Sequence, residues 1–296
     1  MEGQVINWGW PIIIYLFLGG LAGGAYIIGA LADLCDIDED KLIGKISFLV
    51  ALIGIIIGSL CLIYDLGRPE RFLNVLKIYK FTSPMSVGVW GVITFTAFTI
   101  LSVIMIYGTS KDAKGIGKLG YYISLVIPRK AVNAIGLSVG VFLAAYTGVL
   151  LTETSRPFWS DTPFLGALFL ASGVSTAIAF IYFFYGAKRH DEIGQRNKYK
   201  LKLVDNIAIL AEMVILLFML IELHNIGHLV YLKKFKGMFI IGVIIVGLII
   251  PVISNFIHII KYRIKGSKLG MDFITPILIL IGGFLLRYVV VMAGQA

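Results

Sequence analysis

The sequence predicts an all-α integral membrane protein with eight transmembrane helices. Its 296 residues have a mean hydropathy of +0.92, and 58% are hydrophobic whereas only 15% are charged. This balance lies far from that of soluble proteins. Eight apolar stretches are each long enough to cross a hydrocarbon core about 30 Å thick. Because they take up almost the whole chain, we expect one polytopic membrane domain over residues 1–296.

Six of the predicted spans contain no charged residue. They are Pro11–Ala32, Ile46–Tyr64, Met85–Gly108, Ala131–Thr152, Thr162–Ala187 and Met238–Ile260. The other two, Leu203–Ile221 and Phe273–Ala293, are as apolar but contain Asp205, Glu212 and Arg287. All eight therefore fit a bilayer by length and composition.

The connections between the spans are mostly short, and the two longest, 68–83 and 109–130, are predicted as loops. The first span is too long for a signal-peptide core and follows no basic region, so we predict a retained helix. It contains the small residues Gly19–Ala25, which let helix backbones approach closely in lipid. A helix contact face is the favoured interpretation of this cluster, and a site of close ligand approach is the alternative.

Lysine and arginine residues are divided unevenly between the two sides of the membrane. Seventeen of the 26 fall in the loops after spans one, three, five and seven, and eight fall in the loops after spans two, four and six. Positively charged loops stay in the cytoplasm. We therefore predict a multi-pass protein of the cytoplasmic (inner) membrane with both termini outside. The excess of basic residues in cytoplasmic loops, together with attraction to anionic lipid, explains the net charge of +9. We therefore expect the lipid bilayer, and not nucleic acid, as a partner.

Two segments with the same pattern follow the second and fourth spans, on the predicted outer face. They are Asp65-Leu-Gly-Arg68-Pro69 and Glu153-Thr-Ser-Arg156-Pro157. An acid three residues before an arginine can pair with it on the last helical turn, and the residue before a proline leaves helical geometry. We predict that both segments cap their helices and that Arg68 and Arg156 hold loops that dock a partner.

The tryptophans support a shaped outer surface. Trp8, Trp10, Trp90 and Trp159 all fall near the predicted outer interface. Each alone fits an aromatic belt, but a belt would populate both interfaces. We therefore add Trp90 and Trp159, together with Arg71, to the predicted docking surface.

Charged side chains within the spans allow two interpretations. Such groups are costly in lipid and are usually paired or on a proton path. Glu212 lies near the middle of the sixth span and Arg287 lies in the eighth. They could form a structural pair, or Glu212 could act in a proton relay with Asp205 and Asn206. Both interpretations stay open.

The sequence does not favour a haem or a metal in this protein. The first five spans contain no histidine, whereas a bis-histidine haem needs ligands on opposing helices at matched depth. His224 and His228 share a helix face, but only Glu222 offers a local third zinc ligand, which is a weak signal. Cys35 and Cys61 support neither a disulfide framework nor a Cys-ligated cluster.

Tyr146 lies at a depth where its hydroxyl needs a partner. It is seven residues before Glu153, about 10 Å below the end of its helix. A phenol there must bond to protein, water or a ligand. A carbonyl of a lipid-soluble quinone and a group on a neighbouring helix are both possible partners.

Several motifs together resemble the NrfD/PsrC family, the integral membrane subunits of polysulphide reductase and related respiratory oxidoreductases. They are Tyr15–Tyr26, Asp65–Phe72, Ser83–Trp90, Tyr146–Leu151 and Gly282–Tyr288. The resemblance extends over all eight spans. It implies two four-helix bundles without haem, and a menaquinone or ubiquinone bound near the outer face. It also implies an iron–sulphur, ferredoxin-like partner with four cubane clusters, usually joined to a molybdopterin catalytic subunit.

The resemblance also suggests which residues bind the quinone. A family tyrosine in the fourth span that bonds the head group corresponds to Tyr146. The family's first span offers Asn and His, whereas this sequence offers Tyr15 and Tyr26, with Asn7 before the span and no histidine there.

Quinone reduction also needs an acid, because two protons accompany two electrons. Glu153 is the predicted proton donor and His224 the second candidate. We therefore predict a quinone-binding membrane anchor of a multi-subunit respiratory oxidoreductase, without independent activity. The alternative is a solute or ion transporter, because Pro251 and Pro276 could break two spans.

Overall fold

All eight predicted spans are present as helices in the computed structural model. The structure describes residues 8–37, 41–65, 83–108, 115–188, 191–265 and 273–296. Within these ranges there is no strand, and eight helices are long and apolar enough to cross a membrane. The all-α membrane fold is thus confirmed.

The helices keep the order of the predicted spans. Seven spans are α1 (Trp10–Leu34), α2 (Leu42–Asp65), α4 (Pro84–Tyr107), α6 (Arg129–Thr152), α8 (Leu165–Lys188), α9 (Glu192–Ile226) and α11 (Ile274–Ala293). The remaining span consists of η3 (Met238–Ile249), of π-helical geometry, and α10 (Ile250–Lys265), which continues it. Three short helices complete the described residues: α5 (Ile116–Val126), α7 (Pro157–Ser160) and η2 (His228–Phe235).

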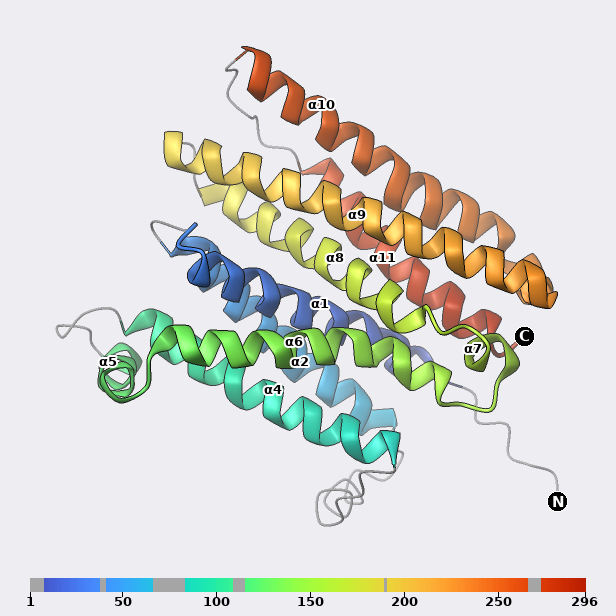
Figure 1. The fold of residues 1–296 in the computed structure, drawn as a ribbon, viewed down its shortest axis with the longest axis horizontal. Helices are drawn as coiled ribbons and strands as arrows, with labels where there is room; N and C mark the ends of the chain where they lie inside the picture. The colour runs from blue at the N-terminus through green and yellow to red at the C-terminus, as the bar shows by residue number, and fades with distance from the viewer. Residues whose placement is uncertain (1–7, 38–40, 66–82, 109–114, 189–190, 266–272) are drawn as a thin grey trace.

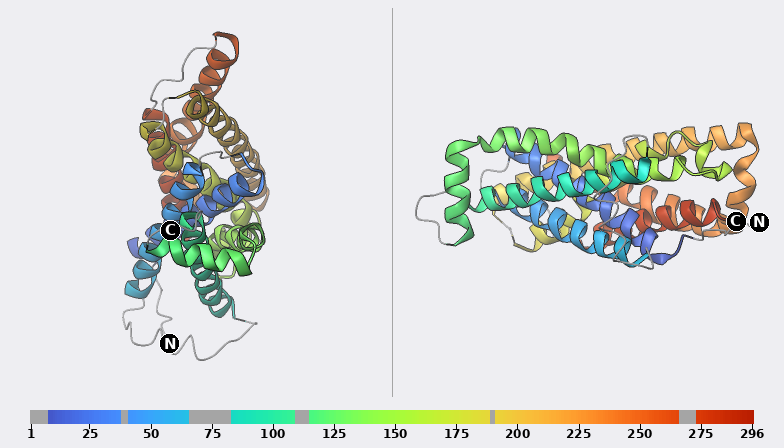
Figure 2. Two further views of the ribbon diagram at one scale, coloured as in Figure 1. Left: turned by 90° about the vertical axis from the view of Figure 1, so that its left-hand side faces the viewer. Right: turned by 90° about the horizontal axis from the view of Figure 1, so that it is seen from below.

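α1 lies at the centre of the molecule. Figure 1 shows it between the group α2, α4 and α6 and the group α8 to α11, and it packs against α2, α6, α8 and α11. Because α1 contacts both groups, two separate four-helix bundles stay a prediction. Figure 2 shows that α5 lies across one end of the spans instead of along them.

Glycine allows the close packing of α1. A Cβ atom on Gly23 would lie 2.7 Å from the carbonyl oxygen of Gly140, and one on Gly24 would lie 2.2 Å from that of Gly173. Real Cβ atoms do not approach backbone so closely, so larger residues would push α6 and α8 away. The predicted helix contact face is therefore confirmed.

Two elements differ from the sequence predictions. The connection 109–130, predicted as a loop, contains α5, an 11-residue helix that is too short for a span. The sixth span, predicted as Leu203–Ile221, is part of the longer α9, Glu192–Ile226. Hydropathy detects only the part of a helix that suits hydrocarbon, and α9 continues beyond it as a polar helix with Asp191 as its N-cap.

Neither intramembrane proline interrupts a span. Pro251 lies where η3 passes into α10, and Pro276 lies in the first turn of α11. A proline clashes with the carbonyl four residues before it, and wider π-type turns relieve such a clash. The broken helices that a transporter would use are not formed at these two positions.

The start of α1 and the end of α11 lie at the same end of the molecule, where the backbone N–H of Trp8 donates to Oε1 of Gln295 at 2.7 Å. Which side of the membrane this is can be tested with single cysteines in a background that lacks Cys35 and Cys61. We expect Cys at Ser160 to react with an impermeant thiol reagent in intact cells, and Cys at Glu192 to be protected. The reverse pattern would overturn the predicted orientation.

Candidate functional site

Two predicted quinone-site residues, Tyr15 and Tyr146, come together near the end where α1 begins and α6 ends. Both are buried, and their hydroxyls are close enough to interact electrostatically. Tyr146 donates to the carbonyl of Pro84 and stacks on Phe142, with ring centroids 5.4 Å apart. No hydrogen bond joins the Tyr15 hydroxyl to any residue in the described ranges. A buried hydroxyl without a protein partner is suited to donate to a ligand carbonyl.

Gly88 of α4 makes room for the Tyr146 phenol, and Gly58 of α2 lies at ordinary contact distance from the Tyr15 ring. A Cβ atom on Gly88 would lie 2.4 Å from the Tyr146 hydroxyl, and one on Gly58 would lie 3.5 Å from the Tyr15 ring. The start of α4, with Pro at its first position, thus sits directly against Tyr146. Two of the motifs singled out in the sequence therefore meet at one place.

Glu153 and Arg156 flank this site at the end of the molecule where α6 ends. Glu153 is the C-cap of α6, so the helix ends before Arg156, and Glu153 interacts electrostatically with Tyr146. Arg156 is the N-cap of α7. The predicted ion pair between the two is not among the pairs formed by the described residues, because the turn from α6 into α7 replaces the expected last helical turn.

The other predicted outer residues lie apart. Trp159 is only 1% exposed, and its Nε1 donates to the carbonyl of Val290 at 2.8 Å, so it holds α7 against α11 from inside. Trp90 is partly exposed on α4, while Asp65 and His224 are exposed at the ends of α2 and α9. Three predicted residues lie outside the described ranges: Asn7, Arg68 and Arg71.

Tyr26 does not join Tyr15 and Tyr146. It lies eleven residues after Tyr15 on α1, about 16 Å further along the helix. Its hydroxyl is 2.7 Å from that of Ser102, which donates to Asn133 at 3.0 Å. A single quinone head group is too small to contact both Tyr15 and Tyr26, so Tyr26 belongs to a different site.

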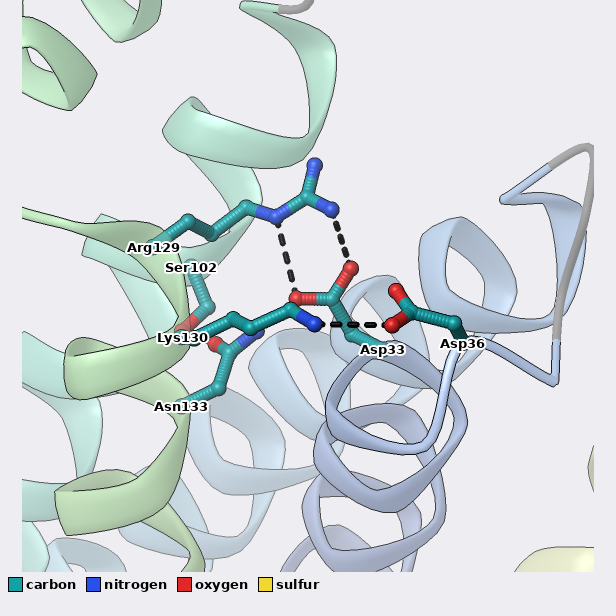
Figure 3. Close-up of polar contacts among 6 residues, drawn as sticks. All are labelled: Asp33, Asp36, Ser102, Arg129, Lys130 and Asn133. Atoms are coloured by element: carbon teal, nitrogen blue, oxygen red, sulfur yellow. Dashed lines mark hydrogen bonds and ion pairs between the residues drawn. The ribbon is translucent and has the colours of Figure 1, made fainter.

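That second site is a buried polar cluster that the sequence did not reveal. Figure 3 shows Asp33 of α1 bound by Arg129 of α6, whose Nε donates at 3.0 Å. Asn133 donates to the same carboxylate at 2.7 Å. Nearby, Lys130 bonds the exposed Asp36 at 2.7 Å and so holds the pKa of that carboxyl below its ordinary value. The partners are about 100 residues apart in sequence, so no local pattern signals the cluster.

Arg287 is fully buried at the junction of four helices. Its guanidinium donates to the carbonyls of Leu16 (3.2 Å), Gly283 (2.8 Å) and Phe169 (3.3 Å), and to the Ser172 hydroxyl at 3.0 Å. Glu212 of α9 forms a hydrogen bond with the same Ser172 hydroxyl and interacts electrostatically with the Arg287 guanidinium. The two predicted partners thus meet, through a serine of α8.

Gly20 explains how a guanidinium fits against α1. A Cβ atom at this position would lie 2.7 Å from an Arg287 nitrogen. The rings of Phe17 and Phe169 cover the guanidinium, with centroids 5.6 and 5.1 Å away. The charge is therefore held between aromatic rings and backbone carbonyls.

A second group of charged side chains, which contains Asp205 and Lys202, lies nearer the N-terminal end of α9. Asp205 accepts from Asn255 at 2.7 Å and from Ser175 at 3.2 Å. Lys202 donates to Asn255 at 3.2 Å and lies 3.2 Å from Nδ1 of His258. Asn255 therefore links Lys202 to Asp205. Because it is a polar residue inside an apolar span, the sequence alone could have indicated this site.

An apolar groove of about 440 Å³ runs between α2 on one side and α8 and α11 on the other. Its α2 wall extends from Ile46 to Ile57, about 16 Å along the helix. Leu18 and Gly54 line the groove at the end nearer Tyr15. Leu18 also contacts Gly58, the residue beside the Tyr15 ring. The groove therefore ends one helical turn from the paired phenols.

Comparison with known proteins identifies the family. A family model described as "Polysulphide reductase, NrfD" matches residues 1–296. The chain belongs to the NrfD polysulphide reductase family. This NrfD-family protein is 30% identical to a polysulfide reductase chain from Wolinella succinogenes, over 99% of its own length and 95% of that relative. It is 29% identical to the NrfD homolog of Haemophilus influenzae, over 97% and 94% of the two lengths.

A more distant relative has another substrate in its name. The protein is 24% identical to a selenate reductase subunit from Mesobacillus selenatarsenatis, over 63% of its own length and 50% of that relative. In this NrfD-family protein the structure brings together the motifs that contain Tyr15, Pro84 and Tyr146.

Proposed function

We propose that the protein is the quinone-reactive membrane anchor of a multi-subunit respiratory oxidoreductase. In this function it exchanges electrons between a membrane quinone, menaquinone or ubiquinone, and an iron–sulphur partner at the outer face. The observation that carries the proposal is the buried pair of phenols, one of them without a hydrogen-bond partner among the described residues, in a member of the NrfD family. When bound, the quinone supplies two-electron, two-proton redox chemistry.

The protein's own residues would bind and orient the head group. The Tyr15 hydroxyl donates to one carbonyl. Tyr146 donates to Pro84 in the structure, so it can turn from Pro84 to the ligand or keep that bond and fix the wall of the site. Glu153, at the end of the same helix and near Tyr146, would transfer protons between this site and the outer surface.

The groove beside α2 suits the isoprenoid tail of the quinone. It is lined by apolar side chains, with Lys188 as the exception at one end, and it begins one turn from the phenols. A tail held there exchanges contacts with lipid for contacts with the groove walls, so its contribution to binding comes from van der Waals packing.

Partners would dock at the end that carries Glu153. Relatives are named as parts of polysulfide and selenate reductases, which fits an iron–sulphur subunit and a molybdopterin catalytic subunit beyond it. Asp65, Arg156 and Trp90 are described residues that offer exposed or half-exposed side chains there. Arg68 and Arg71 stay proposed members of this docking surface.

Replacing Tyr15 with phenylalanine tests the head-group site. Losing one neutral hydrogen bond costs about 0.5–1.5 kcal/mol, so we expect quinone affinity in the purified complex to fall about twofold to tenfold. Stability without quinone should not fall, because the hydroxyl has no described protein partner to lose. Tyr122→Phe, on the exposed face of α5, is the matched control. Unchanged quinone affinity in Tyr15→Phe, with quinone found elsewhere, would refute this site.

Filling the groove tests the tail. Leu49 lines the groove, so Leu49→Trp should weaken binding of long-tailed quinones by more than tenfold, about 1.4 kcal/mol. Binding of a short-tailed analogue should be unaffected, because the head group contacts are kept. Ile56→Trp, exposed on the same helix but outside the groove, is the control. Equal loss for both quinones would show that the substitution acts on the head-group site instead.

A further inference from the structure

The short helix α5 exposes an apolar face. Four large side chains share one side of this helix, because they are spaced three or four residues apart: Leu119, Tyr122, Leu125 and Val126. Their side chains are between 53% and 82% exposed. A contiguous group of large exposed apolar side chains marks a surface that contacts a partner or a membrane.

The opposite face of α5 consists of small residues and packs against α4. Gly117 and Gly120 are buried on this face. A Cβ atom on Gly120 would overlap the carbonyl of Ile104, and one on Gly108 would overlap the backbone at Gly120. Contact between the two backbones therefore fixes the rotation of α5 and keeps its apolar face turned away from α4.

The direction of α5 suits a membrane surface. Figure 2 shows the helix across the end of the spans, so its axis lies close to the plane of a membrane that the spans cross. Its 11 residues extend for about 16 Å, too little to cross the hydrocarbon core. A helix with one apolar face in this position is typical of those that lie between the headgroups and the acyl chains of one leaflet.

The apolar face of α5 continues the lipid-facing surface of the two neighbouring spans. Ile100 and Tyr107 of α4 and Ile135 of α6 are exposed in the parts of these helices that lie nearest α5. Exposed apolar side chains on a span face lipid. A soluble partner on α5 would have to cover a surface that runs on into the bilayer, so the bilayer itself is the favoured occupant.

Basic side chains lie beside this apolar face. Lys118 is exposed on α5, four residues before Tyr122 and seven before Leu125, and so on the same side of the helix. At the end of α4, the Lys45 amine lies 5.7 Å from the centroid of the Tyr107 ring. This end of the protein is the one predicted to face the cytoplasm, where anionic lipids make the leaflet surface negative. The charges therefore match the phosphates of such lipids.

We propose that α5 is an interfacial helix that binds anionic phospholipids of the leaflet at this end of the protein. Its apolar face lies among the upper acyl chains, and Lys118 extends from the same face to the lipid phosphates. Because α5 joins α4 to α6, the bound leaflet holds the ends of these two spans at one level. The inference does not depend on the proposed quinone function.

The test uses the full chain in its complex, reconstituted into vesicles, with a fluorescent label on one cysteine in a background that lacks Cys35 and Cys61. We expect a nitroxide on the upper acyl chain of phosphatidylglycerol to quench a label at Leu125→Cys about twofold more strongly than the same nitroxide on phosphatidylcholine. A label at Ile135→Cys, on the lipid-facing side of α6, should be quenched equally by the two lipids. A label at Glu192→Cys, exposed in the first turn of α9, should be quenched only weakly by either.

Replacing the lysine separates lipid selection from simple contact with the bilayer. Lys118→Gln keeps most of the side-chain length but removes the charge, so the two lipids should then quench the Leu125→Cys label equally. Arg263→Gln removes an exposed charge near the end of α10, at the opposite edge of the molecule in Figure 1, and should leave the preference unchanged.

Three results would overturn the proposal. Equal quenching by the two lipids while Lys118 is in place would show that anionic lipid is not selected. A label at Leu125→Cys that aqueous iodide quenches and lipid does not would place the face in water. A label that neither iodide nor lipid reaches would mean that a second protein chain covers α5.

Discussion

Arg287→Met is expected to lower the stability of the protein by about 3–5 kcal/mol, because several buried acceptors lose the same charged donor at once and each unsatisfied group costs about 1–3 kcal/mol. The methionine fills much of the same space, but it removes the only cation that acts on the buried Glu212 carboxyl from α11. It also strips hydrogen bonds from the carbonyls of Leu16 and Phe169 on two other helices. Thermal unfolding in detergent, followed by the loss of the monodisperse peak, measures this effect.

A double variant shows whether the charge or the shape is responsible. Glu212→Gln in the Arg287→Met background removes the orphaned carboxylate, so part of the lost stability should return. Residues that share a network show such non-additive effects. Arg287→Lys keeps the charge without the planar fork, and a lysine cannot reach three carbonyls on different helices, so it should recover only part of the stability. Full stability of Arg287→Met alone would show that the cluster contributes nothing to the fold.

The membrane architecture could be predicted because lipid imposes a simple rule on sequence. Every span must be an apolar helix about as long as the bilayer is thick, so hydropathy located all eight. The same rule explains the two differences. Hydropathy does not detect α5, which crosses nothing, nor the polar first turns of α9, which remain helical for reasons of capping and packing.

The candidate site could be predicted only in part. Motif resemblance pointed to Tyr15 and Tyr146, which meet, and also to Tyr26, which does not, because residues eleven apart share a helix but not a depth. The relative depth of two residues on one helix can be calculated from the sequence, because each residue adds about 1.5 Å. The hydrogen-bond partner of each polar group cannot be calculated in this way. Asn255 and Asp205 are 50 residues apart, and the bond between them depends on how α9 and α10 pack.

Buried charges illustrate the same limit. Glu212 and Arg287 were noticed because each stands alone in an apolar run, where any charge is conspicuous. Asp33 and Arg129 were not, because each lies at a helix end, where charged residues are ordinary. Burial of such residues depends on whether neighbouring helices end at the same level, which is a tertiary property.

Asp33→Leu is the variant with the second largest expected effect. The Asp33 carboxylate accepts from both Arg129 and Asn133 and joins α1 to α6. Leucine leaves the fully buried amide of Asn133 without its acceptor, which costs about 1–3 kcal/mol. The Arg129 side chain is 20% exposed and can turn to water, so its loss adds less than that of a fully buried partner. We therefore expect a clear drop in thermal stability, smaller than that of Arg287→Met.

Asp36→Asn is the matched control, three residues further along the sequence, because asparagine also tolerates the left-handed backbone at this position, where φ is 50°. It removes the same charge and also breaks an ion pair, with Lys130, but that pair is exposed, with 58% and 74% of the two side chains accessible. Water and salt screen it, so its loss should leave the unfolding temperature within measurement error. The double replacement Asp33→Leu with Asn133→Leu should recover stability relative to Asp33→Leu alone, because no buried amide is then left unpaired. If Asp33→Leu and Asp36→Asn unfold at the same temperature, the cluster in Figure 3 is a solvated surface contact and not a buried link between α1 and α6.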